Sequence, residues 1–141
     1  MFDIVEITDP GDREEAFRIR RVVFCDEQGV DPALEFDGYD ESCRQYLARS
    51  NGRATGTARI RESEPGVFKV ERVAVLDQDR GQGIGRSLMN RTIADARAAG
   101  AISIAIHAQC HAEAFYTALG FRRIGGIFEE ADIPHVRMEL D

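Results

Sequence analysis

The stretch VERVAVLDQDRGQGIGRSLMN, residues 70–90, holds an apolar run, a polar break with three glycines, and then a helix-like pattern. A strand that passes through a glycine-rich turn into a helix forms a natural anion site. The first N–H groups of a helix lack partners within the helix, and the helix dipole adds partial positive charge there. Glycine lets this backbone approach a bulky phosphate closely because it carries no Cβ. The stretch therefore predicts a phosphate-binding turn.

The rest of the chain predicts a mixed α/β domain. Apolar patterning favours strands at 2–7, 44–49, 55–61, 67–76, 102–106, 121–128 and 136–140, with Asn51 and Gly52 marking a hairpin turn. Helical spacing favours helices at 12–29, 83–99 and 112–119, the first opening with a capping box of Asp12 and Glu15. Residues 30–41 are interpreted as a loop. The predicted order is β-α-β-β-β-α-β-α-β-β in one domain over residues 1–141.

The length and net charge of the chain limit the functional classes to which it can belong. A chain of 141 residues suits one domain, and its net charge of −7 argues against a nucleic-acid surface and suits a neutral or cationic small partner. We find no apolar stretch long enough to span a membrane and no secretion signal at the N-terminus. Three cysteines at unrelated spacings indicate reduced thiols. A cytoplasmic protein without a membrane or nucleic-acid partner is expected.

Three phosphate-binding motifs compete for the glycine turn. A P-loop needs Lys and then Ser/Thr after its last glycine, whereas Arg86 and Ser87 follow Gly85 on the wrong spacing. A dinucleotide-binding fingerprint needs a third glycine that is absent here. What remains is Arg-x-x-Gly-x-Gly, from Arg80 to Gly85. This pattern resembles the acetyl-coenzyme A signature of the GNAT N-acetyltransferase family.

The resemblance covers most of the chain. HAQCHAEAFYTALGF, residues 107–121, is similar to the family's other conserved stretch, and RRVVFCDEQGV (20–30) and FEEADIPHVRMEL (128–140) resemble the subgroup typified by ElaA and YjcF. The resemblance implies the GNAT acyltransferase fold, a mixed, mostly antiparallel sheet flanked by helices. It also implies an N-acetyltransferase that moves the acetyl group of acetyl-coenzyme A to an amine, by direct attack in a ternary complex and without a metal.

By this resemblance, the pantetheine arm of the cofactor lies against the strand before the turn, and the pyrophosphate lies on the turn. The family's helix tyrosine corresponds to Tyr116, which would protonate the coenzyme A thiolate. A backbone N–H at Val75 or its neighbours would hold the oxyanion. The residues expected to bind the cofactor are Val73, Ala74, Val75, Arg80, Gly81, Gln82, Gly83, Ile84, Gly85, Arg86, Ser87 and Tyr116.

The general base has several candidates. Glu71 lies two residues before Val73, so the two share a face of the strand if no bulge intervenes. In a partly dry cleft its pKa would rise towards neutrality, which makes it the first choice. His111 and His135 are rivals, and Gln109 could order a water or cap the helix.

The acceptor and some alternatives stay open. The acidic segment EFDGYDE, residues 35–41, either attracts an ammonium group to an acceptor pocket or is a solvated loop. It also resembles the acyl-homoserine lactone synthases, which give an alternative function, as does a coenzyme A-binding module without catalysis. HAQCH looks locally like a zinc site but lacks a fourth ligand of matching spacing, so no metal is expected. The partner is a small-molecule or peptide amine, and the strand-rich C-terminal end could form a homodimer.

Overall fold

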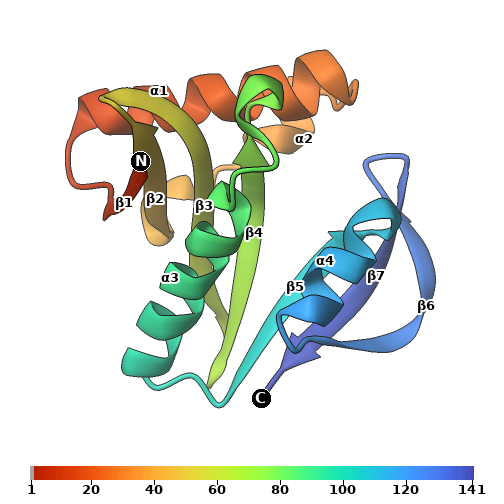
Figure 1. Ribbon diagram of the computed structural model, residues 1–141. Coiled ribbons are helices and arrows are strands. Elements are labelled where there is room, and N and C mark those ends of the chain that lie inside the picture. Colours follow the sequence, from red (N-terminus) through yellow and green to blue (C-terminus); the bar gives the residue numbers. More distant parts are fainter. Residues whose placement is uncertain (1) are drawn as a thin grey trace.

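The computed structural model describes residues 2–141 and contains one seven-stranded sheet with the order β1-β2-β3-β4-β5-β7-β6 (Figure 1). Neighbouring strands are antiparallel except for β4 and β5, which are parallel. The predicted mostly antiparallel sheet is therefore confirmed. The strands are β1 (Phe2–Glu6), β2 (Arg44–Ser50), β3 (Arg53–Glu64), β4 (Val67–Val75), β5 (Ser103–Gln109), β6 (Arg122–Glu130) and β7 (Ile133–Leu140).

The three predicted helices also appear in the predicted order. They are α1 (Pro10–Arg20), which continues as the π-helical η1 (Arg21–Glu27), α3 (Ile84–Ala98) and α4 (Glu113–Ala118). The predicted capping box at Asp12 is wrong. Asp9 caps α1 by accepting a hydrogen bond of 2.9 Å from the Asp12 N–H, and Pro10 occupies the first turn. A proline there loses no hydrogen bond and has its φ already set for a helix, so the helix begins earlier.

Residues 30–41 are more ordered than the expected loop. They form the short helix α2 (Pro32–Glu35), followed by the 3-10 turn η2 (Asp40–Ser42). The Glu35 side chain is buried in an ion pair with the equally buried Arg20. The interpretation of residues 30–41 as a loop rather than a packed element is therefore wrong, because Glu35 and Asp37 fold back onto arginines of α1, β3 and β4.

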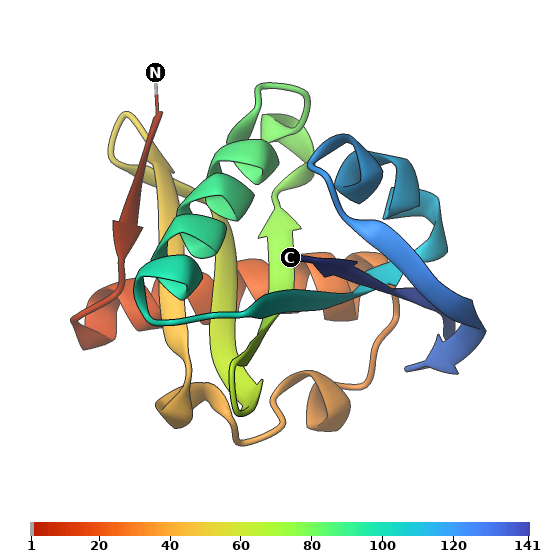
Figure 2. The ribbon, with the colours of Figure 1, turned by 90° about the horizontal axis from the view of Figure 1, so that it is seen from below.

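Helices cover both faces of the sheet. Figure 2 shows α3 in front of the sheet and α1 behind it. The core on the α3 side joins Leu88 and Met89 to residues of β4, β5 and β7 and to Tyr116 of α4. The core on the α1 side joins Ala16 and Ile19 to strands β2 to β4. The sheet thus separates an α3/α4 side from an α1/α2 side.

Strand β4 contains a bulge that changes which residues face each side. Thr57 of β3 pairs with Ala74, and Arg59 pairs with Glu71, so two residues of β4 oppose one of β3. Arg72 within the bulge has a φ of 57°. Val73 then joins the α3-side core and Ala74 the α1-side core. The expectation that Glu71 and Val73 share a face is wrong because the bulge reverses the alternation between them.

Strands β4 and β5 pair only at their first residues. Val67 to Val70 pair with Ser103 to Ile106, and beyond this point the strands diverge (Figure 1). A cleft of about 1090 Å³ opens between them and reaches both sides of the sheet. This volume is generous for a small-molecule site.

Candidate active site

The cleft has two differently lined halves. The turn before α3 and helix α4 line the α3/α4 side, whereas α2, β4 and the β6–β7 hairpin line the other side. The register places His107, Gln109 and His135 away from the α3-side core, because their neighbours Ile106, Ala108 and Val136 belong to it. On the first side lie Gly81, Gly83, Ile84, Gly85, Arg86, Phe115 and Tyr116, and on the second Glu35, Asp37, Arg61, Lys69, Glu71, His107, Glu130 and His135.

The glycine turn opens α3 towards the cleft, as the sequence predicts. Gly83 precedes the helix with a left-handed φ of 85°, and no side chain caps the helix. The N–H groups of Ile84, Gly85 and Arg86 therefore have no partner within the helix. The Ser87 N–H donates to the Gly83 carbonyl at 3.0 Å, so this N–H is already used within the helix. Neither Ser87 nor Gln82 lines the cleft.

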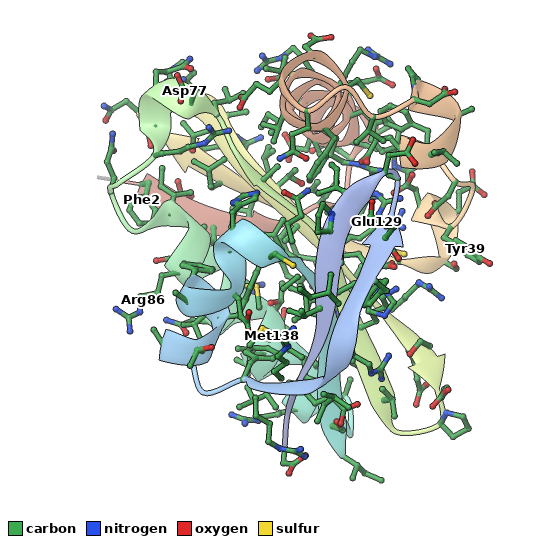
Figure 3. All side chains as sticks on the ribbon, turned by 90° about the vertical axis from the view of Figure 1, so that its right-hand side faces the viewer. Phe2, Tyr39, Asp77, Arg86, Glu129 and Met138 are labelled. Atoms are coloured by element: carbon green, nitrogen blue, oxygen red, sulfur yellow. The ribbon has the colours of Figure 1, made fainter. Side chains whose placement is uncertain are left out.

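The two arginines of the turn behave differently. Arg80 donates to the Val75 carbonyl at 2.9 Å and pairs with Glu27 and Asp77. It therefore braces the turn against β4 and η1. Arg86 is exposed, and among the described arginines and lysines of the cleft it is the one without a carboxylate partner. In Figure 3 it projects outward beside the start of α3.

The edge of β4 presents main-chain groups to the gap. The Leu76 N–H bonds to the Thr55 carbonyl on β3. Because backbone groups alternate in direction along a strand, those of Val73 and Val75 point towards the gap. Ala74 pairs with Thr57 of β3, so its own groups point the other way. Of the three residues predicted to contact the pantetheine arm, Val73 and Val75 are thus oriented for it.

Tyr116 is a buried phenol on the wall of the cleft. It belongs to α4, packs edge-on against Phe115 and Phe121, and lines the cleft while only 7% exposed. Burial raises the pKa of its phenol, which therefore stays protonated. Burial is the single cause of this shift, and no hydrogen bond to the hydroxyl is found within residues 2–141, so the hydroxyl is available to a ligand in the cleft.

Glu71 lies in a cluster of cations. Its carboxylate is 2.8 Å from Arg61, 3.1 Å from Arg59 and 3.2 Å from Lys69. Burial alone would raise its pKa, but the hydrogen bond from Arg61 and the neighbouring charges lower it to about 2. The expected rise towards neutrality is wrong, and a carboxylate of such low basicity is a poor general base.

The acidic segment is held by arginines. Arg59, itself buried, binds Asp37 at 2.7 Å and Asp40 at 2.9 Å. Arg72 in the bulge binds Asp37 and also donates to the Glu35 carbonyl. These ion pairs fix α2 and the segment after it against the bulge. The segment therefore forms a wall of the cleft, and its carboxylates at Glu35, Asp37 and Asp40 are already paired with arginines.

The histidines fall into two groups. His111 contacts the side chain of Gln109 at 2.6 Å, and Gln109 in turn donates to Gln28, the residue that follows η1. His107 and His135 instead flank Glu130 of β6, at 3.0 Å and 3.8 Å. His135 is a candidate base predicted from the sequence, whereas Glu130 and the position of His107 beside it are not predicted. Only pairing of β5 with β7, and the β6–β7 hairpin, brings these three together.

The described residues contain neither a cluster of metal-binding side chains nor a helix suited to a membrane. Among residues 2–141 no group of three or more His, Cys, Asp or Glu side chains could hold a metal ion. No helix of this part of the chain is long and apolar enough to cross a membrane.

Comparison with known proteins gives consistent matches. The acetyltransferase (GNAT) domain family matches residues 22–141. YyaT of Bacillus subtilis (strain 168) is 35% identical over 139 residues, covering 96% of this chain and 93% of YyaT. The N-acetyltransferase YjcF of the same organism is 31% identical over 129 residues, covering 91% of each chain. The crystal structure of Escherichia coli ElaA matches with a TM-score of 0.89 and 26% identity over 100% of both chains. The resemblance to ElaA and YjcF is thereby confirmed.

Proposed function

Because the chain belongs to the acetyltransferase (GNAT) family, we propose that it transfers the acetyl group of acetyl-coenzyme A to the amine of a small molecule or peptide. The cleft at the splay of β4 and β5 carries the proposal, since it joins an open helix N-terminus to an available phenol. The pyrophosphate binds the N–H groups at the start of α3, with Arg86 as the added cation. The pantetheine arm pairs with Val73 and Val75.

The reaction proceeds by direct attack. The acceptor ammonium loses one proton to a base, and the amine nitrogen attacks the thioester carbon. The N–H of Val75 or Val73 holds the oxyanion of the tetrahedral intermediate. As the C–S bond breaks, Tyr116 gives its proton to the thiolate, and the second proton of the attacking nitrogen restores the phenol. The products are the amide, coenzyme A and one proton.

The first experiment is thermal unfolding with and without acetyl-coenzyme A. A ligand at about 100 times its Kd stabilises the native state by about 2.7 kcal/mol, which raises Tm by about 7–10 °C for a chain of this size. Coenzyme A release in the presence of an amine panel then tests turnover. Absence of a thermal shift at millimolar acetyl-coenzyme A would contradict the proposed function. A shift without release of coenzyme A for any amine would favour a binding module without catalysis.

A further inference from the structure

The carboxylates that line the cleft differ in their partners. Five of the six are neutralised by arginine or lysine: Glu27 by Arg80, Glu35 by Arg20 and Arg72, Asp37 by Arg59 and Arg72, Glu71 by Arg59, Arg61 and Lys69, and Asp79 by Arg53. Within residues 2–141, Glu130 is the cleft carboxylate whose ion-pair partners are histidines alone. The hydrogen bond from His107 lowers its pKa, so it carries a negative charge.

The tautomer of His135 follows from its contacts. Its Nδ1 lies 2.6 Å from the Ile133 carbonyl, which can only accept, so Nδ1 carries a proton. In the neutral ring Nε2 then holds a lone pair. This atom lies 3.8 Å from Oε2 of Glu130. Two hydrogen-bond acceptors thus face each other across a gap too long for a direct bond.

A cation with N–H donors fits this gap. An ammonium nitrogen about 2.9 Å from each of two acceptors satisfies both with separate N–H groups. His107 holds the other oxygen of Glu130 at 3.0 Å and so leaves Oε2 for the ligand. Phe128 fixes both rings, since it lies edge-on to His107 and is stacked on His135.

The location suits the attacking group of a transfer reaction. Glu130 and His135 line the α1/α2 side of the cleft, across the sheet from the glycine turn and Tyr116. Figure 3 shows their hairpin, marked by Glu129, reaching towards the α1 side. An acceptor held here reaches the gap between β4 and β5 from the side opposite the phosphates.

On the basis of the acetyl transfer proposed above, we propose that Glu130 and His135 form the acceptor subsite, which binds a protonated aliphatic primary or secondary amine. Glu130 receives the ammonium group, and Nε2 of His135 takes one of its protons. The N–H bond breaks, its electron pair becomes the nucleophile, and the imidazole becomes an imidazolium beside Glu130. Once the amide has formed, His135 releases the proton to water.

The direct test is a titration followed by NMR of the imidazole C–H resonances, in protein saturated with coenzyme A. Ethylammonium chloride is expected to shift the His135 and His107 resonances saturably in the millimolar range. Tetramethylammonium chloride, which has no N–H donor, is expected to shift them no more than sodium chloride does. Glu130→Gln should abolish the ethylammonium response. Glu129→Gln, which removes a charge from the same strand outside the cleft, should retain it.

A kinetic test uses two amines of similar shape. Ethylamine is protonated near neutral pH, whereas trifluoroethylamine is mostly neutral because fluorine withdraws electrons. Glu130→Gln and His135→Gln should lower kcat/KM for ethylamine by about 100-fold, the usual size of a general-base contribution. The loss for trifluoroethylamine should be about tenfold smaller, because its nitrogen needs neither an anion nor a base. Glu129→Gln should behave as the unmodified protein with both.

The outcomes separate this subsite from the proposed function. Equal responses to ethylammonium and tetramethylammonium, or a response that survives Glu130→Gln, would overturn the subsite, whether or not either amine is acetylated. Equal kinetic losses for both amines would do the same. Thermal stabilisation by acetyl-coenzyme A is measured on the same variants and should persist in Glu130→Gln. If acetyl-coenzyme A did not stabilise the unmodified protein, the result would contradict the proposed cofactor site instead of the acceptor subsite.

Discussion

At the scale of single residues, environment decides which groups can perform proton transfer. Tyr116 is a buried phenol with an available hydroxyl, and its raised pKa keeps it a proton donor. Glu71 is a buried carboxylate among three cations, and its low pKa keeps it an anion. The two residues are both within the cleft, yet only Tyr116 has a proton to give.

Tyr116→Phe should separate catalysis from binding. We expect kcat to fall by about 100-fold, since a general acid is lost, while the Kd for acetyl-coenzyme A changes by less than about threefold. Coenzyme A release gives kcat, and calorimetric titration gives Kd. An unchanged kcat would remove Tyr116 from the mechanism, and a large loss of affinity would assign it to cofactor binding.

Glu71→Gln should act on stability more than on chemistry. Removing one partner of a buried ion-pair cluster leaves Arg59 and Arg61 undercompensated, at a cost of about 3 kcal/mol in the free energy of unfolding. Urea unfolding measures this change. Glu62→Gln, on the exposed end of β3, is the control. A fall in kcat of about 100-fold or more in the folded variant would instead support Glu71 as the general base.

At the scale of elements, the junction of β4 with α3 forms the proposed cofactor site. The strand contributes a free edge at Val73 and Val75, and the helix contributes uncapped N–H groups. Gly83 connects them with a left-handed backbone that a side chain adopts only under strain. A Cβ at this position would meet no atom within 4 Å, so the constraint there is backbone strain rather than space.

Two substitutions of Gly83 should separate charge from backbone strain. Asparagine tolerates the left-handed region and is nearly the same size as aspartate. Gly83→Asn should therefore weaken acetyl-coenzyme A binding moderately. Gly83→Asp should weaken it at least about tenfold more, because a carboxylate faces the phosphates. Calorimetric titration measures the Kd of both variants for acetyl-coenzyme A. Equal affinities would show that the phosphates lie elsewhere.

At the scale of the whole molecule, buried ion pairs connect α1, the acidic segment and the central strands. Arg20, Arg59 and Arg72 bind carboxylates from residues 35–40 and Glu71. The pKa of Asp37 is also lowered; burial acts in the opposite direction, but the hydrogen bond from Arg59 outweighs it. The α1/α2 side of the cleft thus combines matched charges with the apolar core beneath α1.

This network makes the free energy of unfolding depend on pH in the acidic range. The folded pKa of Glu71, about 2, lies below its ordinary value of 4.5, so the folded state favours the ionised form. Its contribution is therefore fully present above about pH 4.5 and is lost as pH falls towards 2, at about 1.4 kcal/mol for each unit of pKa shift. Urea unfolding between about pH 6 and pH 3 should show this decline, with a shallower slope in Glu71→Gln. Parallel slopes would contradict the lowered pKa.

Local patterns in the sequence predicted the frame of the fold and the glycine turn that opens α3. Gly81, Gly83 and Gly85 lie within five residues, so the turn could be predicted from their spacing. The bulge at Arg72 could not, because no glycine marks it and the apolar pattern runs through it. The subsite of Glu130 and His135 depends on strand pairing between distant segments, and the charge of Glu71 depends on partners from β3.

The splay of β4 and β5 also bears on aggregation. A strand edge with unpaired N–H and C=O groups is a template on which another protein chain can add a strand. Here the exposed edge of β4 lies inside a wedge that closes where Val70 pairs with Ile106. At the narrow end of the wedge, β4 and β5 lie too close together for another polypeptide strand to fit between them. A slender chain such as pantetheine can enter from the open end. The same geometry that admits the cofactor therefore shields the sheet against edge-to-edge association.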